Sequence, residues 1–339
     1  MRIILHIGSE KTGTTSIQNA LRNDCLRLKK DGVLYPVLFG SENHMEIAVC
    51  AADDNVVSEL RLLELNKLGL NIHEYRAKLQ EKLSNELHSG DYHTVIVSNE
   101  HCHSRIKSNA EMERLRSMLN YFTSDIKVIV YLRRQDLLAV SLYSTKMKLG
   151  GNGPVFPNIT SKMLLPYFCY DLLLERYAKF FGKQNIIVRI YEPGLLVDGD
   201  VVSDFYRVAE LGESPNVKFK SNPSLSAKQL VFLKLFNDRF PLLLNGEINI
   251  HRGNIYSVIK DVLQGPKFTP TRSDAERFYC SFKHSNLRVY NDYSLDISRT
   301  VLFDEDFSHY PENEPTSSLT NSDFMDFIEA IWKRNIGFM

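Results

Sequence analysis

Four short runs rich in isoleucine and valine constrain the fold of this chain more than any other feature. They span residues 2–7, 94–98, 127–132 and 185–191, and each is continuously apolar rather than alternating. Continuous apolar runs are typical of strands in a parallel sheet that is covered on both faces. The segments between them carry apolar residues at helical spacing over 14–30, 74–88, 137–149 and 164–181, as at Ile17, Leu21 and Leu28. Strands that alternate with helices predict an α/β fold with right-handed crossover connections.

The last third of the chain has a different character. A polar loop with two prolines begins at residue 212, and helical spacing follows at 226–240, 273–291 and 322–334. The sequence contains no internal repeat, and no linker is long enough to demand a second domain. We therefore expect one domain over residues 1–339, with an α/β core over 1–211 and a mostly helical part over 212–339.

Composition excludes several classes of protein. The 339 residues include 41 Lys and Arg against 41 Asp and Glu, and 43% are hydrophobic. This balance argues against a disordered chain and against a protein that binds nucleic acid with its whole surface. No apolar run approaches the roughly 18 residues of a membrane span, and the N-terminus resembles neither a signal peptide nor an anchor. Five scattered cysteines without a C-x-x-C pair favour reduced thiols, so we expect a cytoplasmic location.

The turn after the first strand has the features of a phosphate-binding loop. A buried strand runs into a turn bounded by Gly8 and Gly13, and a helix follows that opens with Thr14, Thr15 and Ser16. Such a turn directs backbone N–H groups and a positive helix end at one spot. The match to a Walker A loop is partial, because position 14 is threonine and the lysine is Lys11. No predicted strand ends in the aspartate that a triphosphatase uses to hold Mg²⁺, so we expect no metal.

A second anion site is predicted after the third run. Arg133 follows the strand at 127–132 directly, and Ser141 lies eight residues further on, about two helical turns into the next segment. A guanidinium can hold a phosphate through two hydrogen bonds, and a serine hydroxyl can donate another. Ligands collect at the carboxyl ends of parallel strands, so both motifs are expected at one edge of the sheet.

These two motifs together resemble those of sulfotransferases that use PAPS (3′-phosphoadenosine 5′-phosphosulfate), in particular the bacterial, carbohydrate-type branch. The family's loop pattern, Lys-[Ser/Thr/Gly]-Gly-Thr-[Thr/Arg], stands here as Lys11-Thr12-Gly13-Thr14-Thr15. Its strand-Arg motif with a following Ser corresponds to Arg133 and Ser141, and a strand that ends in Tyr-Glu corresponds to Tyr191 and Glu192. The resemblance implies a three-layer, P-loop-like parallel sheet flanked by helices.

The resemblance also implies an activity and a set of binding residues. The enzyme would transfer the sulfuryl group of PAPS to a hydroxyl, or an amine, of a small-molecule or saccharide acceptor such as a carbohydrate or glycolipid, and release PAP. Lys11 would contact the oxygen that bridges sulfate and phosphate, and Arg133 with Ser141 would hold the 3′-phosphate. Many family members place Trp where Ser16 stands, so the residue that stacks on adenine is not identified. The residues implied to bind the cofactor are Lys11, Thr12, Gly13, Thr14, Thr15, Ser16, Arg133, Ser141 and Tyr191.

The catalytic base has several candidates. Glu100 and then His101 are preferred, because they follow the strand at 94–98 and should lie at the same edge of the sheet. His44 and Glu42 are alternatives from the region after the first helix. A metal site at residues 101–103 is disfavoured, since adjacent side chains diverge.

Other features leave further interpretations open. Tyr143, Phe156, Tyr167, Phe168 and Tyr170 are candidates for an acceptor cleft or for core packing. A P-loop nucleotide kinase or triphosphatase, and a non-catalytic module that binds PAP, are the alternative functions. The sequence does not indicate an oligomeric state.

Overall fold

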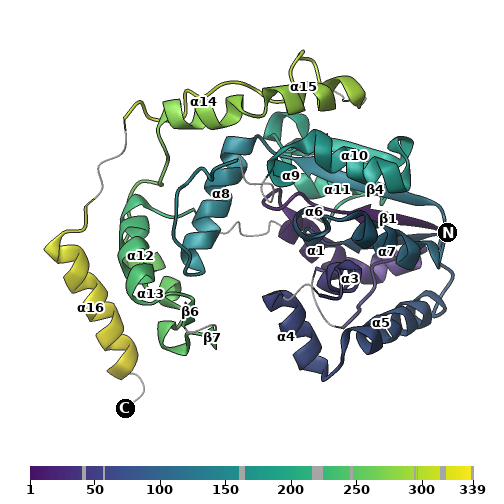
Figure 1. Cartoon of the computed structure of the whole chain (residues 1–339), viewed down its shortest axis with the longest axis horizontal. Coiled ribbons are helices and arrows are strands. Elements are labelled where there is room, and N and C mark those ends of the chain that lie inside the picture. Colours follow the sequence, from purple (N-terminus) through teal and green to yellow (C-terminus); the bar gives the residue numbers. More distant parts are fainter. Residues whose placement is uncertain are drawn as a thin grey trace. The chain divides into compact units, whose positions relative to one another are not determined.

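A five-stranded parallel sheet forms the centre of the first part of the chain. The computed structural model describes residues 1–39, 43–55, 58–159, 165–215, 224–244, 247–293, 295, 297–313 and 318–336. The strands lie in the order β2-β3-β1-β4-β5, and each neighbouring pair is parallel. Figure 1 labels two of these strands, β1 and β4, among the helices of the first part of the chain. Their bounds are β1 Arg2–His6, β2 Val33–Leu34, β3 Thr94–Ser98, β4 Ile126–Leu132 and β5 Ile186–Ile190. The predicted α/β fold with a parallel sheet flanked by helices is confirmed.

Strand β2 was missed by the sequence prediction for a physical reason. It contains only Val33 and Leu34, which pair with Thr94 and Val95 of β3. Two residues are too few to show a periodicity, and the pairing is decided by the neighbouring strand. The other four strands coincide with the four apolar runs to within one or two residues.

The helices are shorter and more numerous than those predicted from the sequence. Before residue 212 they are α1 Thr14–Asn23, α2 Cys25–Lys30, α3 Met45–Ala51, α4 Glu59–Leu68, α5 Ile72–Leu87, α6 His101–Arg105, α7 Asn109–Asn120, α8 Gln135–Lys148, α9 Leu165–Phe168, α10 Tyr170–Phe181 and α11 Val201–Val208. After it they are α12 Ala227–Arg239, α13 Ile255–Val262, α14 Arg272–Cys280, α15 Lys283–Asp292 and α16 Asn321–Ile336. The remaining short elements are strands β6 Leu243–Leu244 and β7 Glu247–Ile248 and the 3₁₀ turns Lys183–Asn185, Pro193–Leu195, Val197–Gly199 and Ile250–Arg252.

Three helices that we expected to be continuous are broken. The helix predicted over residues 14–30 divides at Asp24, and the one predicted over 164–181 divides at Cys169, while residue 164 itself lies outside the described residues. The helix predicted over 273–291 divides at Phe282, whose backbone has φ −112° and ψ 0°. Periodicity alone does not reveal such a break, because the apolar spacing continues across it.

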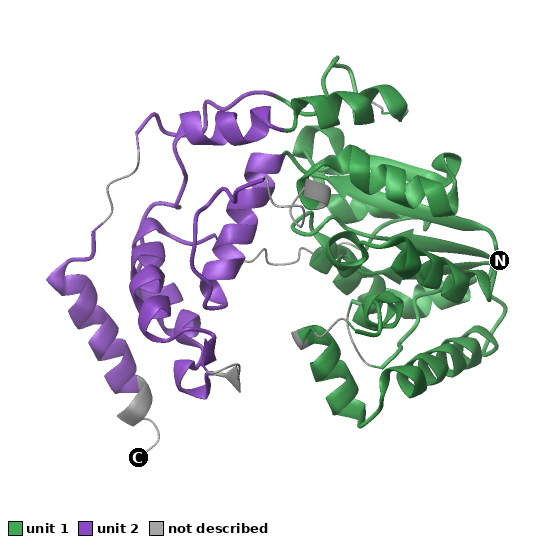
Figure 2. Cartoon of the chain, in the orientation of Figure 1, with its two compact units in different colours: residues 1–134, 160–219, 282–304 green, residues 135–159, 220–281, 305–339 purple. Residues whose placement is uncertain are grey.

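The chain divides into two compact units (Figure 2). The first unit contains Met1–Arg134, Thr160–Phe219 and Phe282–Asp304, and the second contains Gln135–Ile159, Lys220–Ser281 and Glu305–Met339. The expected division after residue 211 coincides with these units only in part. Helix α8 belongs to the second unit although it directly follows β4, and helix α15 belongs to the first.

The core of the first unit lies on both faces of the sheet. On one face Ile4 and Ile129 pack in a single cluster with Ile17 of α1 and Phe205 of α11. On the other face α10 packs against β4 and β5. Residues from both faces, such as Ile129 and Val128, are fully buried. This burial explains why the strands are continuously apolar.

A buried charged network fixes α11 against the sheet. Asp204 is fully buried and accepts a hydrogen bond from the Tyr131 hydroxyl of β4 at 2.7 Å. Arg189 of β5 donates to both carboxylate oxygens of Asp204, from Nε at 3.0 Å and from Nη2 at 2.5 Å. Burial next to this carboxylate raises the pKa of Tyr131. Asp200 starts the same helix by accepting hydrogen bonds from the N–H groups of its first turn.

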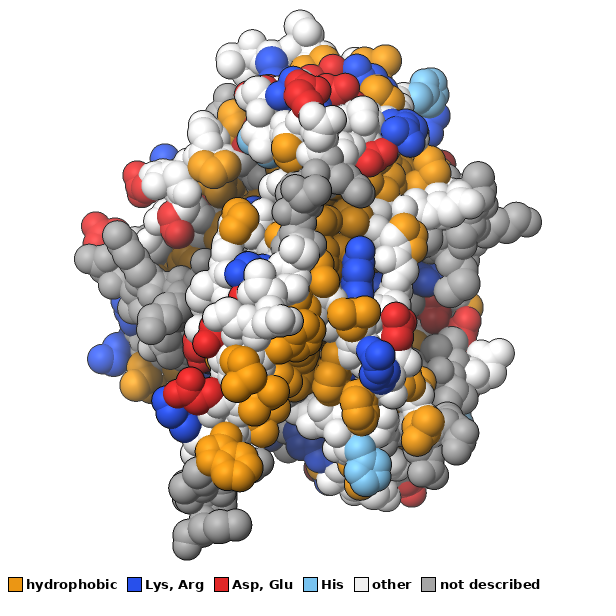
Figure 3. All heavy atoms as spheres, turned by 90° about the vertical axis from the view of Figure 1, so that its left-hand side faces the viewer, with side chains coloured by type: hydrophobic (Ala, Val, Ile, Leu, Met, Phe, Trp, Pro, Cys, Tyr) orange, Lys and Arg blue, Asp and Glu red, His pale blue; other side chains and the backbone are white. Residues whose placement is uncertain are grey.

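The second unit is mostly helical around a smaller core. Tyr143 and Met147 of α8 pack with Leu230 and Leu233 of α12 and with Ile259 of α13. A capping box, in which Ser226 and Gln229 exchange hydrogen bonds, starts α12. Figure 3 shows hydrophobic side chains gathered on the face it turns to the viewer. Exposed apolar residues of this unit include Phe324, Met325, Ile328 and Trp332 of α16.

Within the described ranges of the chain, no helix has both the length and the hydrophobicity that a bilayer crossing requires. All five cysteines are free thiols in the structure.

Candidate functional site

The turn between β1 and α1, called here the glycine loop (residues 8–13), is fastened to the neighbouring strand β4. The N–H and the hydroxyl of Ser9 both donate to the carbonyl oxygen of Tyr131, each at 2.9 Å. The N–H of Tyr131 donates in return to the Gly8 carbonyl at 2.6 Å. These bonds continue the sheet pairing past the end of β1, so the loop leaves the sheet at its carboxyl edge.

Three residues of the glycine loop have a positive backbone φ, among them Gly13 and Lys11. Gly13 has φ 78°, and a Cβ placed there would lie 2.7 Å from the Val201 side chain, so only glycine fits. Lys11 has φ 64°, which is uncommon for a residue with a side chain. Thr12 is fully buried, and its hydroxyl donates to the Ser9 carbonyl at 2.6 Å. The Thr12 side chain therefore shapes the loop from within, and only its backbone remains for a ligand.

The N-terminus of α1 is directed at the interior of the glycine loop. The first N–H groups of a helix have no partner inside it, and the helix dipole makes this end positive. Among the described residues, no acceptor is hydrogen-bonded to the backbone N–H of Thr14 or Thr15. Ser16 and Ile17 donate to the Gly13 carbonyl at 2.9 and 3.1 Å and thereby start the helix. This end of the helix is thus free to bind an anion.

Arg133 joins the end of β4 to the glycine loop. Its Nη1 donates to the carbonyl oxygen of Lys11 at 2.8 Å, and its guanidinium carbon lies 5.5 Å from the centre of the Tyr191 ring. The Tyr170 hydroxyl donates to the backbone carbonyl of Arg133. Three residues predicted for the cofactor site, Lys11, Arg133 and Tyr191, therefore lie together although they follow three different strands.

The charge of Lys11 is influenced by its neighbours as well as by burial. Burial lowers the pKa of Lys11, and the nearby Arg133 lowers it further. The carboxylates of Glu10 and Glu100 act in the opposite direction. The loop thus concentrates two cations beside two acids.

Glu100, our first candidate for the base, lies against the glycine loop. It immediately precedes α6, and its Cα and Cβ are close enough to Gly8 that a Cβ on Gly8 would lie 3.1 Å from the Glu100 Cβ. Its Oε2 accepts a hydrogen bond from Gln18 Nε2 at 2.8 Å. Gln18, on α1, was not predicted for the site, since a glutamine at a helical position gives no signal of its own.

His44, another candidate, is buried and has hydrogen bonds at both ring nitrogens. Its Nδ1 accepts from the backbone N–H of Ser98 at 3.1 Å, so its Nε2 donates to the Pro36 carbonyl at 2.8 Å. Burial lowers the pKa of His44 to about 4. This neutral imidazole ties the start of α3 to the end of β3, and it has no lone pair free to accept a proton. Glu42 lies outside the described residues.

His101 belongs to a second cluster, built around Glu10 of the glycine loop. The His101 Nδ1 lies 3.8 Å from Glu10 Oε1, and the Tyr167 hydroxyl donates to Glu10 Oε2 at 2.7 Å. Burial would raise the pKa of Glu10, but neighbouring His101, Ser104 and Tyr167 and the field of His103 lower it to about 2. Glu10 and Tyr167 were not predicted as site residues. An acidic residue inside a predicted anion loop was the signal available for Glu10.

The Glu10 cluster borders a cavity inside the first unit. The cavity has a volume of about 600 Å³, and Glu10, Tyr167, Asp53 and Arg61 are among its lining residues. Of the aromatic residues proposed for an acceptor cleft, Tyr167 lines this cavity, whereas Phe168 and Tyr170 are buried in the core.

The segment 101–103 does not gather its side chains around one point. Cys102 is fully buried, and burial raises its pKa to about 12. His103 accepts from the Glu10 N–H at 3.5 Å through Nδ1 and is bonded to the Tyr167 carbonyl at 3.1 Å through Nε2. In the part of the chain that the structure describes, no three His, Cys, Asp or Glu side chains are arranged to hold a metal ion.

Ser141, the last predicted cofactor residue, lies on α8 in the second unit. Its carbonyl accepts a hydrogen bond from the Thr145 hydroxyl at 3.2 Å, one helical turn further on. Because Arg133 belongs to the first unit, a phosphate site shared by Arg133 and Ser141 stays a prediction.

Comparison of the sequence with known proteins identifies a distant relative whose activity is not assigned. No family model matches the chain. An uncharacterized protein from Archaeoglobus fulgidus is 27% identical over 213 residues, which make up 60% of this chain. The match covers 55% of that protein, so this chain spans little more than half the length of its relative.

Proposed function

We propose that this chain is a PAPS-dependent sulfotransferase whose donor site is built on the glycine loop, the start of α1 and Arg133. The proposal is supported by the sequence pattern Lys11-Thr12-Gly13-Thr14-Thr15 and by the position of that pattern at the end of the central strand β1. A parallel sheet with the order 2-3-1-4-5 is the arrangement that a P-loop-like fold would have. The donor is expected to need no metal ion.

The observation that carries the proposal is the contact between Arg133 and the backbone of Lys11. A donor with a 5′-phosphosulfate and a 3′-phosphate requires two cationic sites at a fixed separation. Lys11 and Arg133 come from loops that follow adjacent strands, and the 2.8 Å hydrogen bond fixes one relative to the other. A guanidinium also has further N–H donors, so Arg133 can hold the loop and a phosphate together.

The residues present fit a phosphate group at the start of α1. The positive φ values at Gly8, Lys11 and Gly13 wrap the backbone around the helix end. The N–H groups of Thr14 and Thr15 then offer two hydrogen bonds to an anion, and the Thr15 side chain is exposed beside them. Backbone donors of this kind hold phosphate in other loops at helix N-termini.

Each group near the loop has a role in the proposed transfer. PAPS supplies the sulfuryl group. Glu100 accepts the proton of the acceptor hydroxyl, whose oxygen forms a bond to sulfur while the bond from sulfur to the bridging phosphate oxygen breaks. Lys11 stabilises the negative charge that develops on that oxygen, and PAP leaves with the electron pair. Gln18 holds the Glu100 carboxylate in place through its 2.8 Å hydrogen bond.

The acceptor is proposed to enter through the cavity that Glu10 borders. This cavity of about 600 Å³ is lined by several charged and hydroxyl-bearing side chains, among them Asp53, Arg61 and Ser108. Such a lining suits a hydroxyl-rich acceptor, so we propose a carbohydrate or glycolipid hydroxyl, with an amine as the alternative.

Calorimetry with PAP tests the donor site directly. The purified chain should bind PAP without added Mg²⁺, and it should not require Mg²⁺ for sulfuryl transfer from PAPS to a panel of saccharides. Failure to bind PAP would overturn the proposal, as would Mg²⁺-dependent hydrolysis of ATP or GTP in its place. Binding of PAP without transfer to any acceptor, and without an effect of Glu100→Ala, would support the non-catalytic alternative.

A further inference from the structure

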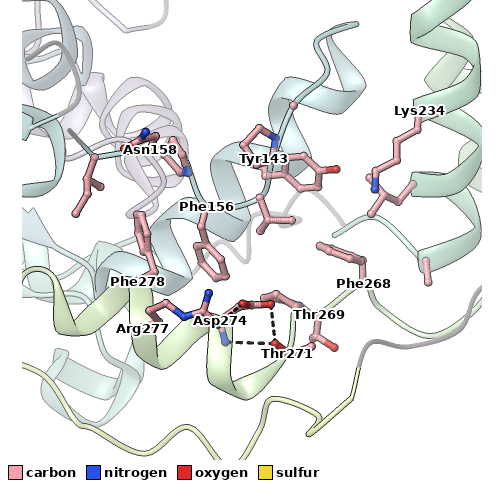
Figure 4. Close-up of a pocket in the computed structure, with 18 of the residues that line it drawn as sticks. Tyr143, Phe156, Asn158, Lys234, Phe268, Thr269, Thr271, Asp274, Arg277 and Phe278 are labelled. Atoms are coloured by element: carbon pink, nitrogen blue, oxygen red, sulfur yellow. Dashed lines mark hydrogen bonds and ion pairs between the residues drawn. The ribbon is translucent and has the colours of Figure 1, made fainter. Parts of the chain in front are cut away.

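A cavity of about 620 Å³ lies entirely within the second unit (Figure 4). Its walls are formed by α8, α12 and α14 and by the loops around residues 153–159 and 268–271. Its volume falls within the range of about 300–1,000 Å³ that is usual for small-molecule sites. None of its lining residues belongs to the glycine loop or to the Glu10 cluster, so the cavity is separate from the proposed donor and acceptor sites.

Aromatic rings form two parts of the wall. Phe156 and Phe278 are stacked, with ring centres 4.8 Å apart and planes inclined by 27°. Tyr143 and Phe268 form a second pair, with ring centres 5.9 Å apart. Of the five aromatic residues proposed earlier for an acceptor cleft, Tyr143 and Phe156 line this cavity. Flat aromatic faces of this kind favour a ligand that presents a flat apolar face of its own.

The hydroxyl of Tyr143 is a buried polar group without a partner. Tyr143 is only 3% exposed, and among the described residues no group forms a hydrogen bond with its hydroxyl. Leaving a buried hydroxyl without a hydrogen bond is unfavourable, so such groups normally have a partner. Figure 4 shows this hydroxyl and the Lys234 side chain of α12 pointing toward the same side of the cavity. A ligand oxygen at that place would satisfy the Tyr143 hydroxyl.

The charged side chains that line the cavity carry a net positive charge. Arg277 and Asp274 form an ion pair at 2.8 Å, and the Thr271 hydroxyl also donates to Asp274 at 2.7 Å. These two charges offset each other. Lys234 is exposed, and within the described residues no carboxylate forms an ion pair with it. The lining therefore has one cation whose charge is not balanced.

We infer that this cavity binds an acidic saccharide, with its sugar ring against the aromatic wall and its carboxylate near Lys234 and Tyr143. The lining also contains hydroxyl and amide side chains, including Thr269, Thr271, Asn158 and Ser281. The hydroxyls of Thr271 and Ser281 already donate hydrogen bonds within the protein, but a hydroxyl oxygen can accept as well. A plain aromatic acid has no hydroxyl to donate to such oxygens, whereas a pyranose ring has several, together with an apolar face for the ring of Phe156. The inference concerns the second unit alone and does not depend on sulfuryl transfer.

Titration calorimetry and saturation-transfer NMR test the inference with three probes. These are a disaccharide that contains glucuronic acid, the same disaccharide with glucose in its place, and benzoate. The acidic disaccharide should bind to the full chain, and the neutral disaccharide and benzoate should each bind at least about 10-fold more weakly. No binding of the acidic disaccharide, or equal binding of the neutral one or of benzoate, would overturn the inference.

Matched variants test whether the acidic disaccharide binds in this cavity. Lys234→Gln should weaken binding of the acidic disaccharide about 10-fold and leave the neutral one unaffected, because it removes only the charge. Tyr143→Phe should weaken binding about 5-fold without lowering the melting temperature, since it removes a hydroxyl that has no partner in the fold. Lys260→Gln, an exposed lysine of α13 outside the cavity, is the control and should bind as the parent does. Unchanged affinity in both Lys234→Gln and Tyr143→Phe would contradict the assignment, whether or not PAP binds.

Discussion

Arg133 Nη1 donates a 2.8 Å hydrogen bond to the carbonyl oxygen of Lys11, which lies 122 residues earlier in the chain. The contact places a guanidinium from the end of β4 on the backbone of the loop that follows β1. It also helps to hold Lys11 in its left-handed conformation, with φ 64°. Lys11 and Arg133 are thus held together at one edge of the sheet, where we propose a single anion site rather than two independent ones.

Arg133→Ala should weaken PAP binding by about 10- to 100-fold, because a hydrogen bond to a charged group contributes about 1.5–3 kcal/mol. Isothermal calorimetry measures this directly. Arg116→Ala, an exposed arginine on α7, serves as the matched control and should leave the affinity unchanged. Parent-like affinity in Arg133→Ala would remove Arg133 from the donor site.

Lys11→Ala should reduce kcat about 100- to 1,000-fold while changing the PAP dissociation constant less than about 10-fold. The reason is that Lys11 is proposed to act on charge that develops only in the transition state. Single-turnover kinetics with PAPS, together with PAP calorimetry, separates the two effects. A loss of PAP affinity with kcat unchanged would show that Lys11 binds the donor without favouring the transition state.

Glu100→Gln should lower kcat about 10²- to 10⁴-fold and leave the free energy of unfolding nearly unchanged, since glutamine keeps the size of the side chain. His44→Gln should show the opposite pattern. It disturbs a buried imidazole with two hydrogen bonds and should cost about 1–3 kcal/mol of stability, with kcat per folded molecule unaffected. If His44→Gln abolished turnover and Glu100→Gln did not, the base would be His44.

The stability of the fold should decrease as pH falls from about 6.5 toward 4. Burial lowers the pKa of His44 and of His103 to about 4, and that of His6 to about 3, from 6.5. Between these values the unfolded chain binds protons that the folded chain does not, so protonation favours unfolding. Each histidine contributes a slope of about 1.4 kcal/mol per pH unit in this window.

Urea midpoints measured at pH 7.0, 6.0 and 5.0 test this dependence, and replacing His103 by glutamine should make the decline shallower. Glu10 has little effect between pH 7.0 and 5.0, because its contribution to stability is lost only below its ordinary pKa of 4.5, as the pH falls toward about 2. A midpoint that stays constant or rises on acidification would contradict the prediction.

Asp204→Ala should lower the free energy of unfolding by about 3–5 kcal/mol, because it leaves the largely buried Arg189 guanidinium without its counter-ion. Asp204→Asn, which can still accept from Tyr131, should cost less. Glu81→Ala, an exposed acid on α5, should stay within about 0.5 kcal/mol of the parent. Denaturant unfolding followed by circular dichroism provides the measurement, and similar midpoints for Asp204→Ala and Glu81→Ala would show that the network is not stabilising.

The roles of the cavity residues and of the candidates for the catalytic base could be predicted from the sequence only in part. Glu100 could be placed near the loop in advance, because it follows a strand that neighbours β1. His44 could not be judged in advance, because its role depends on the Ser98 N–H and the Pro36 carbonyl that meet its ring. Tyr143 and Phe156 could be proposed as aromatic lining, but which cavity they line was decided by the packing of α12 and α14.

The sequence by itself determined the α/β fold, the four longer strands and the position of the glycine loop, because buried strands, helical spacing and turn glycines are local patterns. Only the tertiary structure decided which distant groups meet. Gln18 reaches Glu100 across 82 residues, and Tyr167 reaches Glu10 across 157. Such contacts depend on the order of strands and on helix packing, which no short-range periodicity encodes. For the same reason the break between α14 and α15, and the division of the chain into two units, appeared only in three dimensions.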